Sequence, residues 1–578
     1  MNKPLDSVTI TTVWSYFWRV CREMRETVER TATNVLIVTL HDLAYTIYDA
    51  DGNALAVPEG IPHRLLSPKL GVKHIREKFG DDIHPGDVFL ANTPDDGAAH
   101  LPDWVYIRPV FCDGELTFFA VMGVHVADNG GAQPGSNFMS FDNISEGFNI
   151  PLSRIVKGGE WNNEVFDVIM ANNRLPDLMR RESSACIGSL AIGDRRLTEL
   201  CEKYGREAVV ACTREMMDRA EAAVRKQIES WPDGTWHAEA SADSDGKDLT
   251  KPITVRASLT VNGSDLYFDF SDTDPETDGM LNIHDYMTYS DCCCNSFLFF
   301  GRELLTYHNE GSCRPIHMKT RSGTLVDASR TAKIAAGVAL TGGLVNEVIQ
   351  NLLSQVLPEK AIAPYSRQVT SNIITMGRPG VFVSFSASAG AGAVYGLDGS
   401  QSCAAGRTLG NIGKTNVEDE MQRFPWEYQR YEFLTDKHGA GRWRGAPGIV
   451  WAIENHAGRC FHQTGSWDGF KTQAKGLQGG MDSPLNEAYI LRADGTKEIF
   501  ESRDFFTDLG DVEVSVTGGG AGVGDPAERD PAAVAEDVRN ELVSVEFARK
   551  VYKVAVDPVT FAVDEAATKA FRDKINRN

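Results

Sequence analysis

A mixed α/β (α+β) fold with more than one domain is predicted from three observations. The chain has 578 residues, more than one ordinary domain, so we expect two or three packed units. Residues 104–111 and 253–261 are rich in β-branched and aromatic side chains and run into turn sequences, which is typical of strands. Residues 164–230 contain few glycines or prolines and carry charged clusters, which is typical of helices.

The predicted elements alternate along the chain. An amphipathic helix opens it, because apolar residues recur at helical spacing at Val13, Phe17, Val20, Cys21, Met24 and Val28. Strands and turns follow to about residue 156, and the helical block then ends at the turn sequence Trp231-Pro-Asp-Gly234. Asn262-Gly263 predicts a hairpin. Further helices are expected at 291–305, 341–356, 532–542 and 563–575.

These segments predict three regions. Residues 1–231 form an N-terminal region that ends with the helical block, and residues 232–525 form a mixed region of strands, helices and glycine-rich loops. Residues 526–578 form a helical tail. Two glycine-rich runs, 410–415 and 517–524, resemble phosphate-binding loops, but the first has Thr408 where a P-loop needs glycine. The second precedes Asp525-Pro526 rather than a helix, so we interpret it as a backbone loop packed against another chain.

Composition narrows the possible partners. The net charge of -22 and the pI near 5.1 disfavour nucleic acid and anionic membranes, since both need a basic face. No apolar run approaches the ~20 residues of a membrane span, and the amino terminus lacks a basic region followed by an apolar core, so a cytoplasmic location is expected. The eleven cysteines lack Cys-x-x-Cys spacing, which favours buried free thiols.

Two short His/Asp clusters carry the strongest chemical signal. His100-Leu-Pro-Asp103 and His125-Val-Ala-Asp128 flank two strand-like runs separated by Asp113-Gly114. A hairpin with this turn would return His125 to the neighbourhood of His100. Imidazole and carboxylate groups gathered in this way are what a divalent metal needs. Either histidine taken alone is more often a hydrogen-bonded structural residue.

A third polar pair interrupts an apolar region. Residues 35–40 and 43–48 are predicted to be strands, and His41-Asp42 lies between them. Because buried strands rarely carry ionisable groups unless these are paired or bind a cation, Asp42 is a candidate fourth ligand. The alternative is a salt bridge between Asp42 and an arginine such as Arg30.

These motifs resemble the hydantoinase B family. Its pattern Asn-Asp-Pro-x-x-Gly-Gly-Thr-His-x-x-Asp corresponds to Asn92-Thr-Pro94-Asp-Asp-Gly97-Ala-Ala-His100-Leu-Pro-Asp103, and its His-His-Ala-Asp-x-Gly-Gly to His125-Val-Ala-Asp128-Asn-Gly130-Gly131. Further ordered matches extend to residue 526. The departures include Ala98, Ala99 and Val126, and they leave the predicted ligands in place.

The resemblance implies a hydantoinase B-like fold with a loop-borne metal site in residues 1–231. The ligands would be His100, Asp103 and His125 with Asp42 as a fourth, and Asp128 would fix an imidazole or act as a catalytic base. Such mixed nitrogen and oxygen ligands suit Zn²⁺ or Mn²⁺, with iron less favoured. The implied partner is a larger hydantoinase A-like subunit of actin-like ATPase fold that binds ATP and Mg²⁺, in an α2β2 or larger assembly.

The implied activity is ATP-dependent opening of a cyclic amide such as a lactam, hydantoin or oxoproline. Phosphorylation of the amide oxygen on the partner subunit would remove amide resonance, and a metal-bound water would then attack the activated carbon. One alternative is a subunit of an acetone- or acetophenone-type ketone carboxylase, which would use bicarbonate. Another is a non-catalytic scaffold of the ATPase subunit, which should purify without stoichiometric metal.

Overall fold

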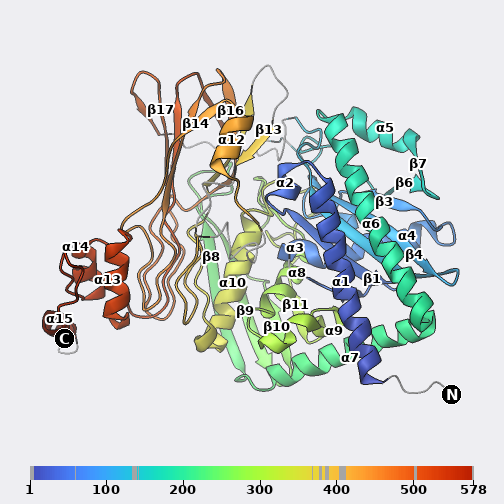
Figure 1. Ribbon diagram of the computed structural model, residues 1–578, viewed down its shortest axis with the longest axis horizontal. Coiled ribbons are helices and arrows are strands. Elements are labelled where there is room, and N and C mark those ends of the chain that lie inside the picture. The colour runs from blue at the N-terminus through green and yellow to red at the C-terminus, as the bar shows by residue number, and fades with distance from the viewer. Residues whose placement is uncertain are drawn as a thin grey trace. The chain divides into compact units, whose positions relative to one another are not determined.

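The computed structural model describes residues 6–58, 60–132, 140, 142–367, 369–375, 381–384, 390–401, 412–499 and 504–575. The chain divides into two units, one of residues 1–238 and 255–349 and one of residues 239–254 and 350–578. The three regions predicted from the sequence stay a prediction. The mixed α/β, multi-unit fold is confirmed by the helices and sheets below (Figure 1).

A seven-stranded antiparallel sheet organises the first unit. Its two central strands, β5 and β4, are joined by the hairpin that the sequence predicts. In order across the sheet the strands are β2 (Ala54–Ala56), β1 (Leu43–Asp49), β5 (Glu115–His125), β4 (Asp103–Cys112), β3 (Val88–Ala91), β6 (Ser153–Lys157) and β7 (Glu160–Trp161).

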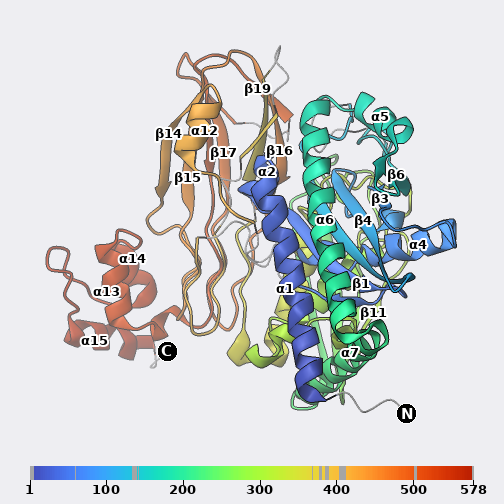
Figure 2. The same ribbon diagram turned by 45° about the vertical axis from the view of Figure 1, so that its right-hand side comes forward.

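Three long helices accompany this sheet: α1 (Ser7–Thr31), α6 (Pro176–Tyr204) and α7 (Arg206–Ile228). Asp6 caps α1 by accepting a hydrogen bond from the Thr9 amide, and all six residues that predicted the helix are buried. In Figures 1 and 2, α1 and α6 run side by side across the sheet, and α6 contacts β4 and β5. Apolar residues from α1, α6, α7 and the strands form one continuous core.

Shorter elements complete this part of the chain. The hairpin predicted around Asn262-Gly263 is confirmed in a second sheet, whose order is β11 (Ile316–Lys319), β10 (Asp265–Asp269), β9 (Ile253–Asn262) and β8 (Gly234–Ala242). The expected helix at 341–356 is α10 (Thr341–Val356), whereas the one expected at 291–305 is α8 (Asp285–Ser296) followed by η2 (Arg302–Tyr307). The others are α2 (Val35–Val38), α3 (Pro62–Leu65), α4 (Lys69–Phe79), η1 (Pro94–Asp96), α5 (Asn163–Ala171) and α9 (Glu310–Cys313).

The strand predicted at residues 35–40 is wrong. Residues Val35–Val38 form the short helix α2, because the Asn34 side chain accepts the Leu36 amide at 3.1 Å and caps a helical turn. Periodicity alone does not separate helix from strand in so short an apolar run. The chain then turns at His41, whose φ of 55° is left-handed, and enters β1 at Leu43 as predicted.

Two antiparallel sheets form most of the second unit. One has the order β13 (Val381–Ser384), β12 (Val369–Thr375), β16 (Cys460–Trp467) and β19 (Asp504–Thr507). The other has the order β14 (Trp426–Phe433), β15 (Ile449–Asn455), β20 (Val512–Val516), β17 (Glu487–Leu491) and β18 (Lys497–Glu498). The unit also contains the short helices η3 (Pro358–Lys360) and α12 (Val417–Arg423).

The glycine run at 517–524 packs against loops of its own chain, and the expected contact with another chain stays a prediction. A Cβ atom at Gly520 would lie 1.9 Å from the carbonyl oxygen of Ala391, and one at Gly518 would lie 1.8 Å from that of Pro484. Only glycine allows backbones to approach this closely. In the other run, residues 410 and 411 lie outside the described residues.

The two predicted tail helices are present as α13 (Pro531–Arg539) and α15 (Glu565–Ile575). The tail also contains η4 (Pro526–Glu528), α14 (Val545–Phe547) and the π-helical turn η5 (Ala548–Tyr552), which the sequence did not predict. The buried Arg529 guanidinium ties the tail to its own unit, because it donates to both Asp398 and Asp537 at 2.7 Å. Charge-assisted bonds of this kind are the stronger ones when buried.

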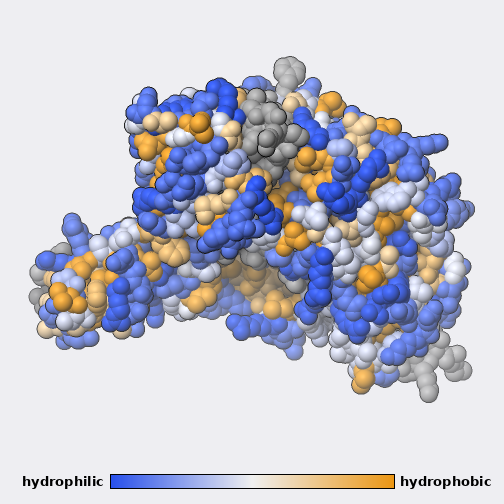
Figure 3. Space-filling model, turned by 45° about the horizontal axis from the view of Figure 1, so that its top comes forward, coloured by the Kyte–Doolittle hydropathy of each residue, from blue (hydrophilic) through white to orange (hydrophobic). Residues whose placement is uncertain are grey.

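Hydrophilic side chains predominate on the face of the molecule in Figure 3, with hydrophobic ones in small groups among them. Among the described residues, no helix is long and apolar enough to cross a bilayer. The ten cysteines in the described ranges are buried and not disulfide-bonded, as expected from their spacing.

Because α6 shares the core of the first unit, a substitution in that core should destabilise the protein much more than one at an exposed position. Leu190 on α6 is fully buried, whereas Leu305 on η2 is 51% exposed. Leu190→Ala should lower the free energy of unfolding by about 2–5 kcal/mol, because it removes methyl groups and leaves a cavity. Leu305→Ala, the matched control, should stay within about 0.5 kcal/mol. Denaturant unfolding of both variants measures the difference, and equal losses would contradict the assigned core.

Candidate metal centre

The β4–β5 hairpin brings the predicted metal ligands together. Asp103 begins β4 and His125 ends β5, and the two residues are direct partners across the strands. The turn between the strands has positive φ at Asp113 (52°) and Gly114 (80°), as a tight hairpin turn requires. His100 lies three residues before Asp103, and its carbonyl accepts the Asp103 amide at 2.9 Å. The predicted return of His125 towards His100 is therefore confirmed.

Two buried asparagines join the loops that carry the histidines. The Asn92 side chain donates to the Leu101 carbonyl at 2.8 Å and to Asn129 Oδ1 at 3.1 Å. Asn129 Oδ1 also accepts the Trp104 indole N–H at 2.8 Å. Because Asn92 belongs to the first motif and Asn129 to the second, these bonds hold the motifs in one arrangement.

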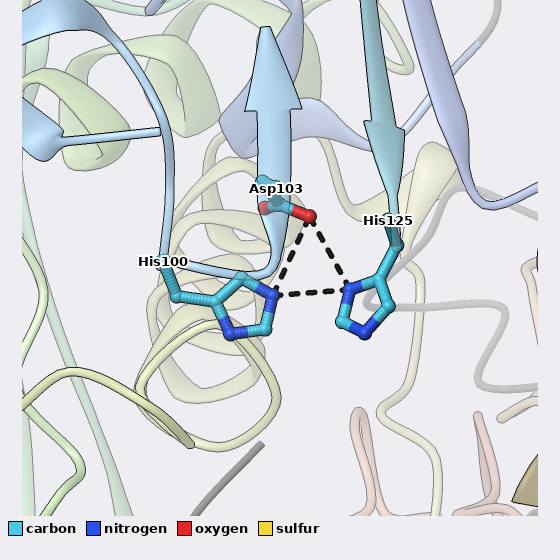
Figure 4. A group of neighbouring side chains, drawn as sticks. All are labelled: His100, Asp103 and His125. Carbon is cyan, nitrogen blue, oxygen red and sulfur yellow. Dashed lines mark hydrogen bonds and ion pairs between the residues drawn. The ribbon is translucent and has the colours of Figure 1, made fainter. Parts of the chain in front are cut away.

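His100, Asp103 and His125 form a triangle of donor atoms (Figure 4). His100 Nε2 lies 3.1 Å from His125 Nδ1 and 3.4 Å from Asp103 Oδ1, and His125 Nδ1 lies 3.3 Å from the same oxygen. Asp103 is 1% exposed and His100 is 5% exposed. The three ligand atoms therefore face one another in an interior position.

These separations fit a small divalent cation. Ligand atoms about 2.0–2.2 Å from an ion lie roughly 3.0–3.4 Å from each other in tetrahedral or octahedral sites. Asp103 Oδ2 is buried and has no hydrogen-bond partner among the described residues, and such a group normally has one. Two nitrogens and a carboxylate are also a common donor set for Zn, Mn or Fe. The residues present therefore fit the ion that the sequence predicts.

A backbone carbonyl sets the orientation of His100. Its Nδ1 lies 2.9 Å from the carbonyl oxygen of Ala335. A carbonyl only accepts, so the proton must sit on Nδ1, and the lone pair of Nε2 then points at the triangle. This acceptor is a main-chain atom more than two hundred residues from His100 in sequence, and no side-chain motif signals it.

Arg64 balances the negative charge of the site. It lies on α3 with 5% of its surface exposed. Its guanidinium donates to Asp103 Oδ1 at 2.8 Å and also pairs with Asp42. Contacts with α8 fix α3, since His63 Nδ1 lies 3.1 Å from the buried Asp291 and Ser290 bonds the Pro62 carbonyl.

The electrostatics keep Asp103 and His125 in the forms that can bind a metal ion. Burial raises the pKa of Asp103, but the Arg64 charge and the contacts with His100 and His125 outweigh it and hold the pKa well below its usual range. Burial lowers the pKa of His125 to about 4, although the bond to Asp103 opposes this. Asp103 is therefore ionised and His125 neutral near pH 7, as metal ligands must be.

Asp42 lies beside the triangle but is not one of the three residues whose donor atoms lie closest together. Its Oδ2 is 3.8 Å from His125 Nδ1, and its other oxygen pairs with Arg64. The alternative of a salt bridge with an arginine is thus confirmed, but the partner is Arg64 rather than Arg30, which lies near Glu26. Its role as a fourth ligand stays a prediction.

The Asp128 carboxylate pairs with Arg174. It accepts the Arg174 amide at 2.7 Å and the Arg174 guanidinium at 2.9 Å. The acceptor for His100 Nδ1 is Ala335 instead. Arg174 therefore engages both oxygens of the carboxylate, and these contacts favour a role for Asp128 in shaping its own loop. The predicted role of Asp128 as a base is not tested by this geometry.

Sequence reasoning missed Arg64 as well as the two asparagines. Asn92 and Asn129 lie inside the quoted motifs, so their position was a usable signal. Arg64 stands in the apolar segment Ile61-Pro-His-Arg-Leu-Leu66, and a charged residue there is unusual enough to predict a buried partner. Its partners are Asp42, just before β1, and Asp103, at the start of β4. Only the fold brings these two residues together.

The chain matches the sequence model of hydantoinase B/oxoprolinase over residues 6–526. It is 27% identical to the beta chain of the caprolactamase of Pseudomonas jessenii, over 98% of this chain and 99% of that protein. It is also 27% identical to one component of a putative D-/L-hydantoinase of Pseudomonas sp. (strain NS671), over 96% of each chain. At 25% identity it resembles the acetophenone carboxylase delta subunit of Aromatoleum aromaticum, over 92% of this chain and 84% of that one.

The fold agrees with these similarities. A chain in the crystal structure of the ATP-dependent caprolactamase from Pseudomonas jessenii superposes with a TM-score of 0.89 at 26% identity, covering 99% of this chain and 100% of that one. The hydantoinase B-like fold expected from the motifs is therefore confirmed. The ordered match of sequence and structure along the whole chain shows that this protein belongs to the hydantoinase B/oxoprolinase family.

Proposed function

We propose that this chain is the metal-bearing subunit of an ATP-dependent cyclic amide hydrolase, which opens the ring of a lactam, hydantoin or oxoproline. His100, Asp103 and His125 would hold a divalent ion, Zn²⁺ or Mn²⁺ before iron, with Asp42 as a further anionic ligand. The observation that carries the proposal is the buried donor triangle, in a chain that matches a caprolactamase component along its full length. An ion in this position supplies Lewis acidity and lowers the pKa of bound water.

The residues around the triangle have separate tasks in this proposal. Asp103 supplies negative charge, while Arg64 keeps that carboxylate ionised inside the protein. The Ala335 carbonyl holds the His100 proton at Nδ1. Burial excludes bulk water, which strengthens each of these electrostatic interactions.

A partner chain is part of the proposal. An unstrained amide resists attack because its resonance must be lost, and phosphorylation of the amide oxygen removes that resonance. Three relatives of this chain are each named as one subunit of an enzyme: a caprolactamase, a putative hydantoinase and an acetophenone carboxylase. These names support work within a larger assembly. We place ATP and Mg²⁺ on a larger actin-like ATPase subunit, in an α2β2 or larger assembly.

A second candidate function is ATP-dependent ketone carboxylation with bicarbonate. The similarity to an acetophenone carboxylase delta subunit favours it, but identity and coverage are both higher for the caprolactamase component. A third candidate is a non-catalytic scaffold of the ATPase. The intact ligand set argues against it, since a scaffold has no need for three converging donors.

Removing a proposed ligand should abolish metal retention. His100→Ala, Asp103→Ala and His125→Ala should each weaken the binding of zinc by more than the ~10–100-fold that is typical of residues behind the ligands. Asp42→Asn should weaken zinc binding less, because Asp42 lies farther from His125 than Asp103 does. Elemental analysis after gel filtration gives the metal content per chain.

The matched control is His84→Ala, because the His84 side chain is 54% exposed and pairs only with Asp82 among the described residues. Its metal content should equal that of the parent chain. Full occupancy in both His100→Ala and His125→Ala would show that the triangle is not the metal site.

The neutral His125 predicts a pH effect on the metal-free chain. Its pKa is about 4 in the folded state and 6.5 ordinarily, so the unfolded state binds more protons between these values. Stability should therefore fall as pH drops from about 6.5 to about 4, by up to about 3 kcal/mol. His125→Gln should flatten this part of the profile, while His84→Gln should not. Denaturant unfolding with a chelator measures it, and an unchanged slope in His125→Gln would contradict the assignment.

The origin of the product atoms separates hydrolysis from carboxylation. With the partner subunit, ATP and labelled water, one solvent oxygen should enter the new carboxylate of the opened ring, and labelled bicarbonate carbon should not be retained. Asp103→Ala should abolish product while ATP binding on the partner persists, since activation and attack occur on different chains. Mass spectrometry of the product decides, and retained bicarbonate carbon would favour the carboxylase.

A further inference from the structure

We infer that Glu146 is the positioning residue for His100, acting through the backbone of residues 334–335. The inference rests on the proposed function in so far as the oriented imidazole serves a metal ion. Glu146 touches neither histidine in the contacts described, and it contributes no ligand atom to the triangle. Its effect would be to fix the position of the carbonyl group that sets the His100 tautomer.

Three hydrogen bonds link Glu146 to His100. Glu146 Oε1 accepts the backbone amides of Ile334 at 2.9 Å and Ala335 at 3.1 Å. The Ala335 carbonyl then accepts the His100 Nδ1 proton at 2.9 Å. One oxygen of the Glu146 carboxyl group therefore holds the residue whose carbonyl orients His100.

The 330–337 loop is also held by residues other than Glu146. The Asn282 side chain donates to the Lys333 carbonyl at 2.9 Å, and the Ala336 amide donates to the Met280 carbonyl at 3.0 Å. With these contacts before and after Ala335 in the chain, loss of the Glu146 contacts would free only the segment that faces His100. The remaining bonds would keep the loop folded.

Glu146 is itself held close to the second histidine motif. A Cβ atom at Gly131 would lie 2.5 Å from the Glu146 carbonyl oxygen, and one at Gly147 would lie 2.2 Å from Asn129 Nδ2. The Phe148 amide donates to the Asn129 carbonyl at 2.7 Å. Glycine at 131 is therefore required for the approach of the Glu146 segment. The same segment thus spans from the His125 motif to the acceptor of His100.

A carboxyl group in this place has an energetic cost. Glu146 is 2% exposed, and burial raises its pKa to about 8 in spite of the two amide bonds. A buried acidic group that is not paired with a cation usually destabilises a protein. No salt bridge of Glu146 occurs among the described residues. Glu146 nevertheless holds the two backbone amides of residues 334 and 335. A positioning role explains why an acidic residue stands here in spite of this cost.

Three variants of the full chain test the inference. Glu146→Ala removes the acceptor, Glu146→Gln keeps an acceptor oxygen of the same reach, and Glu182→Ala is the matched control. Glu182 is an equally buried carboxylate of the same unit that accepts the backbone amides of Thr33 and Asn34. Zinc affinity is measured by competition titration. The His100 tautomer is measured in the metal-free chain by nuclear magnetic resonance of isotope-labelled histidine, with the signal assigned by its loss in His100→Gln.

Glu146→Ala should weaken zinc binding by about 10–100-fold, as changes behind a metal ligand do, and its His100 signal should move away from the Nδ1-protonated form. Glu146→Gln should bind zinc within about threefold of the parent, since an acceptor oxygen for the two amides remains. Glu182→Ala should lose stability but keep both the parent affinity and the parent tautomer.

Parent-like zinc affinity and tautomer in Glu146→Ala would overturn the inference, and so would losses in Glu182→Ala equal to those in Glu146→Ala. If the parent chain takes up no zinc, the proposed function fails. The tautomer of metal-free His100 in Glu146→Ala still decides the role of Glu146 in that case.

Discussion

The pairing of β4 with β5 is the constraint on which the site depends. Asp103 and His125 are direct partners across this hairpin, and a shift of one residue in register would turn one of them to the opposite face of the sheet. The register is protected from both ends. A two-residue turn with two left-handed residues closes one end, and the Asn92–Asn129 bond joins the loops at the other. The candidate metal ligands are therefore placed by the same interactions that build the central sheet.

Burial of charge is the second requirement. Asp42 and Asp103 are almost fully buried, and two adjacent carboxylates inside a protein would normally take up a proton. The guanidinium of Arg64 contacts both and prevents this for Asp103. Because α3 carries Arg64 and α8 anchors α3, helices far from the hairpin in sequence control the charge of the donor triangle. A cation that bound at this site would therefore meet the Asp103 carboxylate already in its ionised form.

The parts of the site that the sequence predicts are those with local or periodic signals. The apolar alternation and Asp113-Gly114 identify the hairpin, and the hairpin brings His100, Asp103 and His125 together. Asp42 was placed correctly near this group, but its pairing with Arg64 depends on a long-range contact. The strand predicted at 35–40 is a helical turn because one side-chain cap, from Asn34, outweighs a short apolar run. The Ala335 carbonyl leaves no trace in the sequence, since every residue has a carbonyl group.

The same geometry accounts for three of the departures from the family pattern. Val126 stands where many relatives of the pattern carry a second histidine, and here it is 2% exposed within the core beside the helices. Its neighbour His125 is a partner of Asp103 in the triangle, and successive residues of an extended chain point to opposite sides. A side chain at 126 therefore packs into the core while His125 faces the donors.

Ala98 and Ala99 are also buried, at 3% and 0%, and contribute no donor atom. These three residues are thus buried and leave the donor set unchanged, so any difference in substrate between this chain and its relatives should be sought in side chains outside the triangle.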